Sequence, residues 1–177
     1  MMIEVKHWFA ADSPHARFLC VIFLVATLNV FVRLNFIPLT ISTDGYSYMD
    51  SARLISGGEV EKTYPGRLLK PLAPLGILLF TPLFHGNMVA GFLTLNIFLY
   101  ILLAAAMYAL LSLFTTDRFL AMQGTLIFIS AYPVLEYGLN LYSEMGSWLL
   151  FVVALIGAVR YYRDASWRNF IIASGVI

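Results

Sequence analysis

The chain has few charged residues. Only 12% of its 177 residues are charged, whereas an average soluble domain has about 25%. So little charge cannot cover the surface of a soluble globule of this size, and 60% of the residues are hydrophobic, with a mean hydropathy of +0.82. A soluble enzyme, a disordered chain and a nucleic-acid-binding module are therefore excluded. An integral membrane protein in contact with a lipid bilayer remains.

Cysteine and histidine are also scarce. The single cysteine, Cys20, cannot form an internal disulfide, and it lies in an apolar run where we expect a small buried hydrophobe. The histidines His7, His15 and His85 are scattered and do not form a pair with ligand spacing. A net charge of +1 gives no basic surplus, so no nucleic-acid partner is predicted.

Long apolar runs dominate what is present. Because a membrane-spanning helix needs about 20 apolar residues, we predict an all-α, polytopic transmembrane bundle of about five membrane helices. Residues 1–177 then form a single transmembrane domain. Its predicted parts are a first span at 17–38, an outer loop with juxtamembrane helices at 39–86, and remaining spans within 87–177, at 87–114, 119–135, 145–159 and from 169 onward. A crossing cut off at residue 177 would leave polar backbone in hydrocarbon, which predicts an incomplete module: a fragment of a longer protein or a chain truncated at its gene.

The outer loop contains an amphipathic segment. Over residues 45–56, Tyr48, Ala52 and Ile55 fall on one helical face. Asp44 precedes this segment as a candidate N-cap, and Gly57 with the next glycine ends it. A juxtamembrane helix is therefore predicted directly after the first span.

Residues 68–84 decide the topology. They are apolar, but they contain Lys70 and three prolines, and the stretch after Lys70 is too short for an ordinary span. If this segment does not cross, the N-terminus, the 115–118 turn and the 160–168 loop share one side, which their basic residues mark as cytoplasmic. If it crosses, more basic residues gather on one side, but Asp44 and Glu144 are separated. We adopt the first topology.

Three short motifs follow one another in this arrangement. They are D-x-x-x-Y from Asp44 to Tyr48, R-L-L-K-P from Arg67 to Pro71, and the pair Ser143-Glu144 just before a span. Over residues 17–165 this order resembles the N-terminal part of the GT-C superfamily of membrane glycosyltransferases. The resemblance implies an enzyme of hexosyl or mannosyl type in the bacterial inner membrane, with a cytoplasmic N-terminus. Its donor would be a polyprenyl-phosphate-linked sugar, and its unknown acceptor would react at the outer face.

Two carboxylates are the candidate catalytic residues. The resemblance implies Asp44 as the base that removes the acceptor's proton, with Glu144 assisting it. Two structural roles stay open beside these: an N-cap for Asp44, and for Glu144 a helix-start carboxylate favoured by the helix dipole. A divalent metal held with the help of Asp44 and Glu144 is a further alternative, and no other cofactor is predicted.

The candidate substrate-binding residues are two cations and two tyrosines. Arg67 and Lys70 would bind the lipid-linked phosphate, for which the planar guanidinium suits bidentate contact. Tyr46 and Tyr48 would line the sugar site. The structural alternatives are cations that extend to lipid headgroups and an aromatic belt at the membrane interface.

A second function class remains open. The chain would then be a non-enzymatic polytopic membrane subunit or a transporter fragment, in which 68–84 is a broken span that lines a path. Carboxylates in the middle of a span are typical of such proteins, and the predicted spans contain none.

Overall fold

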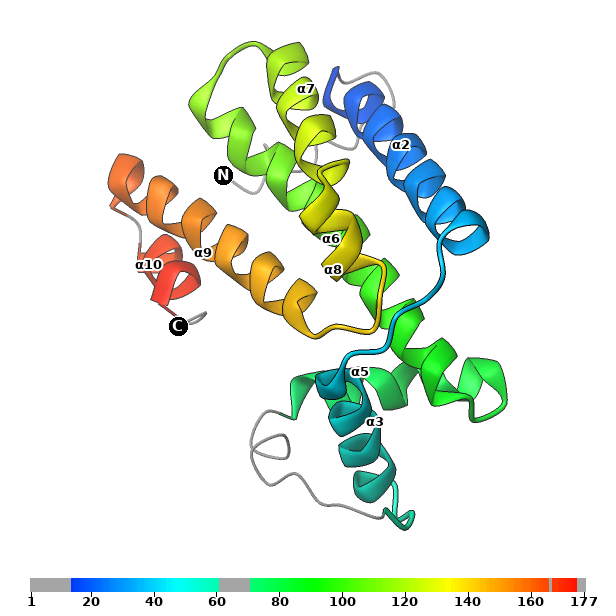
Figure 1. The fold of residues 1–177 in the computed structure, drawn as a ribbon. Helices are drawn as coiled ribbons and strands as arrows, with labels where there is room; N and C mark the ends of the chain where they lie inside the picture. The colour runs from blue at the N-terminus through cyan, green and yellow to red at the C-terminus, as the bar shows by residue number, and fades with distance from the viewer. Residues whose placement is uncertain (1–13, 61–70, 166, 175–177) are drawn as a thin grey trace.

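The computed structural model describes residues 14–60, 71–165 and 167–174, and its regular elements are helices (Figure 1). They are α2 (Pro14–Phe36), α3 (Thr43–Ile55), α5 (Leu72–Phe80), the 3-10 helix η1 (Thr81–Phe84), α6 (Met88–Phe114), α7 (Arg118–Ile129), α8 (Tyr132–Gly138), α9 (Glu144–Asp164) and α10 (Trp167–Ser174). The all-α prediction is confirmed for these residues.

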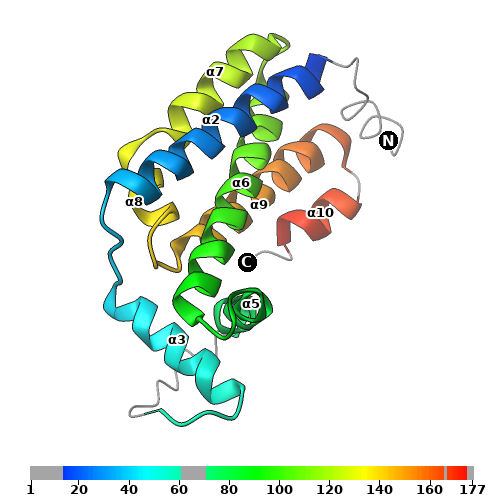
Figure 2. The same ribbon diagram turned by 90° about the vertical axis from the view of Figure 1, so that its right-hand side faces the viewer.

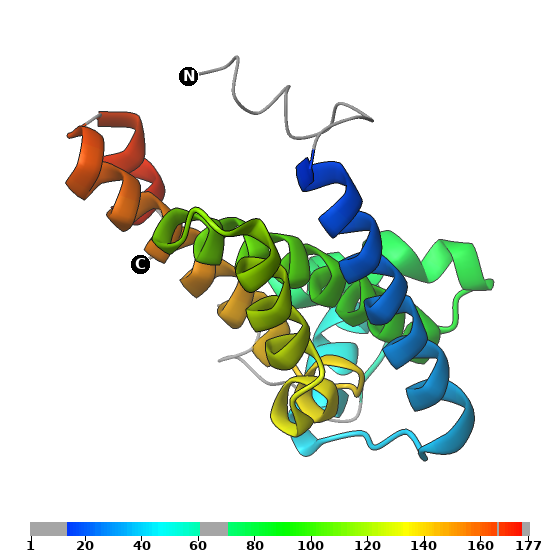
Figure 3. The same ribbon diagram turned by 90° about the horizontal axis from the view of Figure 1, so that it is seen from above.

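The long helix α6 forms the centre of the bundle. It packs against α2 and α7 and against α9, and the view from above places α2 and the α9–α10 hairpin on opposite sides (Figure 3). Its side chains Tyr100, Leu103 and Tyr108 are fully buried. Asn87 begins α6 by accepting a hydrogen bond from the backbone N–H of Ala90.

Three helices are long and apolar enough to cross a membrane, namely His15–Phe36, Met88–Phe114 and Glu144–Arg163. Their outward faces carry exposed apolar side chains such as Leu24 and Phe151. Such faces are consistent with a lipid environment and with a multi-pass membrane protein. Cys20 lies on an exposed face of α2, so the expectation that it is buried is wrong.

The span predicted at 119–135 is broken. Helices α7 and α8 meet at an angle of 60° around Ser130, and together they can form a fourth crossing. Pro133 stands at the start of α8, where its missing N–H is harmless, but within a continuous helix it would remove a hydrogen bond. The segment predicted to start a span at 169 contains α10, which packs on α9, so the fifth crossing stays a prediction.

The described part of the 68–84 segment lies across the bundle. Figure 2 looks down the axis of α5 while α6 runs up the page. Helices α5 and η1 have nine and four residues, which gives about 20 Å of helix against the about 30 Å of hydrocarbon in a bilayer. This part is therefore too short to span by itself, as predicted.

Helices α3 and α5 pack together at the end of the bundle where α6 begins. They share a small apolar core with α6 and the loop before α9, made of Tyr48, Met49, Ala52, Ile77, Phe92 and Leu141. The predicted helix is confirmed with Tyr48 and Ala52 on its buried face, but Ile55 is 42% exposed and its expected place on that face is wrong. The helix ends where Gly57 adopts a positive φ of 83°. We call the end of the bundle that carries α3 and α5 the junction end.

Candidate functional site

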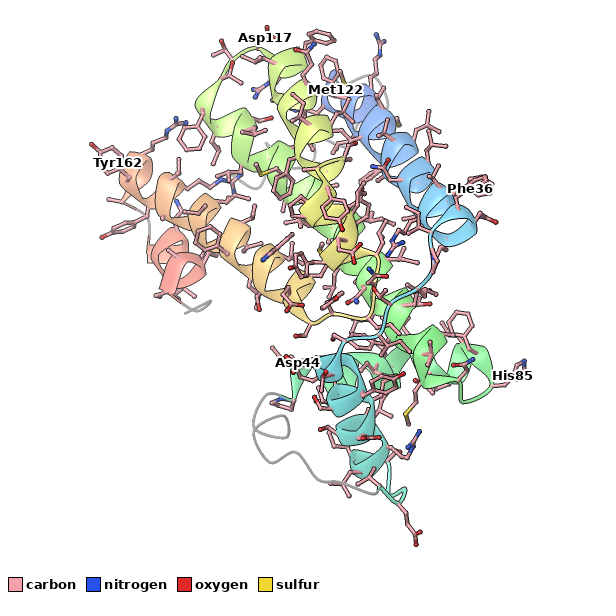
Figure 4. All side chains as sticks on the ribbon, in the orientation of Figure 1. Phe36, Asp44, His85, Asp117, Met122 and Tyr162 are labelled. Atoms are coloured by element: carbon pink, nitrogen blue, oxygen red, sulfur yellow. The ribbon has the colours of Figure 1, made fainter. Side chains whose placement is uncertain are left out.

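At the junction end, two loops far apart in the sequence are joined. Ile41 and Leu141 form a parallel β-bridge, and the N–H of Leu141 donates to the carbonyl of Thr40 at 3.4 Å. The Ser42 hydroxyl donates to the carbonyl of Leu141 at 3.1 Å. These contacts place the start of α3 beside the loop that leads into α9, and Figure 4 labels Asp44 at that start.

The first turn of α3 lies directly against this loop. A Cβ atom added to Gly45 would lie 2.4 Å from the carbonyl oxygen of Leu141, closer than real Cβ contacts come. Only glycine permits so close an approach of helix and loop. Asp44 therefore stands between two residues, Ser42 and Gly45, that both contact Leu141, and Glu144 follows Leu141 by three positions.

Ser42, and not Asp44, is the N-cap of α3. Its hydroxyl accepts from the N–H of Gly45 at 2.9 Å while it donates to the carbonyl of Leu141. An ionised carboxylate can only accept, so aspartate could not make both bonds. The prediction of Asp44 as N-cap is wrong. The half-buried Asp44 lies in the first helical turn, where a negative charge interacts favourably with the helix dipole.

Glu144 is the first residue of α9 and is half-buried. Its Oε2 atom is buried and has no hydrogen-bond partner among the described residues. Buried polar atoms are nearly always paired, so this carboxylate oxygen at the start of α9 is a candidate acceptor for a hydrogen bond from a substrate hydroxyl.

A buried polar cluster lies beside the junction. The Arg33 guanidinium is 4% exposed and donates through Nη2 to Asn140 Oδ1 at 2.7 Å and to Glu136 Oε2 at 3.4 Å. Asn96 Nδ2 donates to the carbonyls of Asn140 and Tyr142. Glu136 lies on α8 and Asn140 in the loop after it, so Arg33 points into the bundle.

Sequence reasoning missed Arg33, Asn96 and Asn140 as members of the site. A signal was present, because polar side chains inside apolar helices are costly unless they bond to one another. Asn96 lies within the α6 span and Arg33 near the end of α2.

The chain matches no protein-family model, no curated protein and no solved structure. Its candidate site is thus defined by its own geometry: two carboxylates, Asp44 and Glu144, at the starts of two helices whose preceding loops are bonded together. In such a pair one carboxylate can accept the proton of a hydroxyl group while the other orients that hydroxyl.

The remaining predicted site residues differ in their surroundings. Tyr46 is 54% exposed on α3, whereas Tyr48 is 5% exposed and packs in the apolar core shared with α5. Arg67 and Lys70 lie outside the described residues. Within the part of the chain that the structure describes, no three His, Cys, Asp or Glu side chains gather as a metal site.

Charge separates between the two ends of the bundle. The described carboxylates of the junction end are Asp44, Asp50, Glu59, Glu136 and Glu144. Its two described arginines, Arg33 and Arg53, each pair with an acid at 3.4 Å. At the opposite end the described segments contain Arg17, Arg118, Arg160, Arg163 and Arg168, together with Asp117 and Asp164. Among the described residues, the junction end thus has the larger excess of acidic side chains.

Proposed function

We propose that this protein is a GT-C-like membrane glycosyltransferase, which transfers a sugar from a polyprenyl-phosphate-linked donor to an acceptor at the outer membrane face. The order of the three motifs supports the proposal, as does the helical bundle with long apolar helices. The observation that carries it is the hydrogen-bonded junction between Ser42 and Leu141, which joins the loops leading to Asp44 and Glu144.

The proposed reaction needs a proton acceptor and a stabilised leaving group. The acceptor's hydroxyl oxygen bonds to the anomeric carbon of the sugar, and the bond from that carbon to the donor's phosphate oxygen breaks. Asp44 takes the hydroxyl proton, Glu144 orients the hydroxyl, and the phosphate leaves with the bonding electron pair. Positive groups stabilise that charge, and Arg67 and Lys70 are proposed for this task from the motif. No step is routed through a metal.

The proposed orientation follows from charge. Basic residues in short loops mark the cytoplasmic side of a membrane protein. The opposite end of the bundle, with Arg118 at the start of α7 and Arg160 and Arg163 late in α9, is then cytoplasmic. The acidic junction end faces outward, in the bacterial inner membrane, where lipid-linked sugars would meet their acceptor.

The direct test is a transfer assay on the protein as its gene encodes it, in membranes with a polyprenyl-phosphate sugar. Asp44→Asn removes the proton acceptor and keeps the shape, so we expect a rate about 100-fold lower or more. Asp50→Asn is the matched control, because Asp50 lies on the same helix and pairs only with the exposed Arg53 among the described residues. A folded Asp44→Asn protein with near-normal turnover would sink the proposed role.

Accessibility labelling separates the enzyme from the non-enzymatic alternative. With Cys20 replaced by alanine, single cysteines at the exposed positions Tyr46, Tyr137 and Thr116 are treated with a membrane-impermeant maleimide. The proposal predicts that positions 46 and 137 react from the outer side and position 116 does not. Positions 46 and 137 reacting from opposite sides would rule out a shared site and favour a transporter or scaffold.

A further inference from the structure

Asn140 joins three parts of the molecule at the junction. Its Oδ1 accepts from Arg33 of α2 at 2.7 Å and from the N–H of Thr40, just ahead of α3, at 3.2 Å. Its backbone carbonyl accepts from Asn96 of the central helix α6. Asn140 is fully buried and Asn96 is 1% exposed. One residue therefore bonds to α2, α6 and the loop that leads into α3.

The partners fix the orientation of both asparagine amides. Arginine and a backbone N–H only donate, so the oxygen of Asn140 must face Arg33 and Thr40. Backbone carbonyls only accept, so the nitrogen of Asn96 must face Asn140 and Tyr142. The nitrogen of Asn140 has no partner among the described residues. A change to aspartate therefore removes two hydrogen bonds at Asn96 and none at Asn140 among the described residues.

The same chain segments carry the two carboxylates. Thr40 lies four positions before Asp44, and Asn140 lies four positions before Glu144. The two stretches, from Thr40 to Asp44 and from Asn140 to Glu144, are bonded to each other through Ile41, Ser42 and Leu141. Any loosening at Asn140 therefore shifts the start of α3 relative to the start of α9.

We propose that Arg33, Asn96 and Asn140 form a clamp that positions Asp44 and Glu144 relative to each other. These three are positioning residues, since they act through the two loops and not on the substrate. The catalytic part of this inference rests on the proposed function. The mechanical part, that the clamp holds the loops together, is measurable without any activity.

The chemistry of the bonds provides matched variants. Asn140→Asp keeps the accepting oxygen, replaces a nitrogen without a described partner by a second oxygen, and adds a negative charge beside the Arg33 guanidinium. Asn140→Leu loses both bonds, to Arg33 and to Thr40. Asn96→Asp replaces a donor with an oxygen that faces two carbonyls. A purely apolar packing role would rank these variants differently, because leucine suits an apolar core better than aspartate does.

The experiment uses two readouts on the protein as its gene encodes it, in membranes. The first is the disulfide yield between cysteines introduced at Ile41 and Leu141, since paired strands lie about 4.8 Å apart and a disulfide needs Cα atoms about 4.4–6.8 Å apart. The second is sugar transfer from the lipid-linked donor, resolved into kcat and KM.

We expect Asn140→Asp, which keeps the acceptor for Arg33 and Thr40, to retain far more cross-linking and transfer than Asn140→Leu. Asn140→Leu and Asn96→Asp should lower the disulfide yield several-fold and kcat about 10-fold or more, with KM for the donor little changed. If Asn140→Leu does not fold, Asn140→Ser, whose hydroxyl is too short to reach Arg33, takes its place with the same expectation.

Three outcomes would overturn the inference, each in a distinct way. Unchanged cross-linking in Asn140→Leu and Asn96→Asp contradicts the clamp itself. Reduced cross-linking with unchanged kcat contradicts its role in positioning the site. A loss in Asn140→Asp as large as in Asn140→Leu contradicts the assigned bonds. Failure of the proposed function is distinguishable, because the lipid-linked donor would then give no transfer even in the unmodified protein, while the cross-linking pattern would persist.

Discussion

Replacing Gly45 with alanine tests how closely α3 must approach the loop before α9. The added Cβ would lie 2.4 Å from the carbonyl oxygen of Leu141 and 3.3 Å from the Cγ2 atom of Ile41. The nearer atom belongs to the backbone and cannot rotate away. Contacts below 3.0 Å are essentially not found, so helix and loop must separate by at least 0.6 Å, the difference between 3.0 and 2.4 Å.

Two opposing effects set the magnitude of this change. Overpacking costs about 1–3 kcal/mol, and alanine within a helix returns about 0.5–1 kcal/mol relative to glycine. We therefore expect Gly45→Ala to lower the free energy of unfolding by about 1 kcal/mol, the centre of a net range of about 0–2.5 kcal/mol. Gly146→Ala in α9 is the control, because its Cβ would lie 3.9 Å from Leu99 of α6, an ordinary van der Waals contact. Only the stabilisation of the helix by alanine then remains.

Thermal unfolding in detergent, together with cross-linking of cysteines at Ile41 and Leu141, provides the assay. Gly45→Ala should lower both the midpoint and the cross-linking yield, and Gly146→Ala should lower neither. If Gly45→Ala matches the control in both measurements, the contact between α3 and Leu141 is not as close as described, and the account of the junction fails.

Two further predictions concern other contacts. Tyr48→Ala should lower the free energy of unfolding by about 3 kcal/mol, because Tyr48 is buried in the core between α3 and α5. Tyr46→Ala should change the free energy of unfolding by about 0.5 kcal/mol or less, since Tyr46 is exposed. Denaturant titration in micelles compares the two variants, and equal effects would contradict the orientation of α3. Gly157→Ala should weaken the packing of α10 on α9 by about 1–3 kcal/mol, because the new Cβ would lie 2.7 Å from the backbone nitrogen of Ala173. Its unfolding midpoint should fall relative to that of Gly146→Ala, and an unchanged midpoint would show that α10 is not held at Gly157.

Local sequence patterns predicted the long helices and α3 well. The expected span at 87–114 is α6 at Met88–Phe114, and the expected helix at 45–56 is α3 at Thr43–Ile55. Both follow from hydropathy and end signals within a few residues, such as Asn87 and Gly57. The bend at Ser130 could not be predicted from local pattern alone, because a proline within an apolar run can either kink a helix or end it.

The junction could not be predicted in the same way. Thr40 and Asn140 are 100 residues apart, and the one bridge between their loops leaves no periodic pattern in the sequence. The inward direction of Arg33 depends on which face of α2 packs against α6 and α7, and α2 is apolar on nearly every side. The same ambiguity explains the wrong expectation for Cys20, because an apolar helix does not reveal which face contacts protein and which contacts lipid.

The central claim is that Asp44 and Glu144 work in one site. A double-mutant cycle on sugar transfer tests it most directly, with Asp44→Asn, Glu144→Gln and the double variant measured in membranes that contain the lipid-linked donor. Residues that act as a unit have non-additive effects. We predict that each single change slows transfer and that the double variant is no slower than the slower single one. Rate losses that multiply, or single variants that transfer at the normal rate, would contradict the claim.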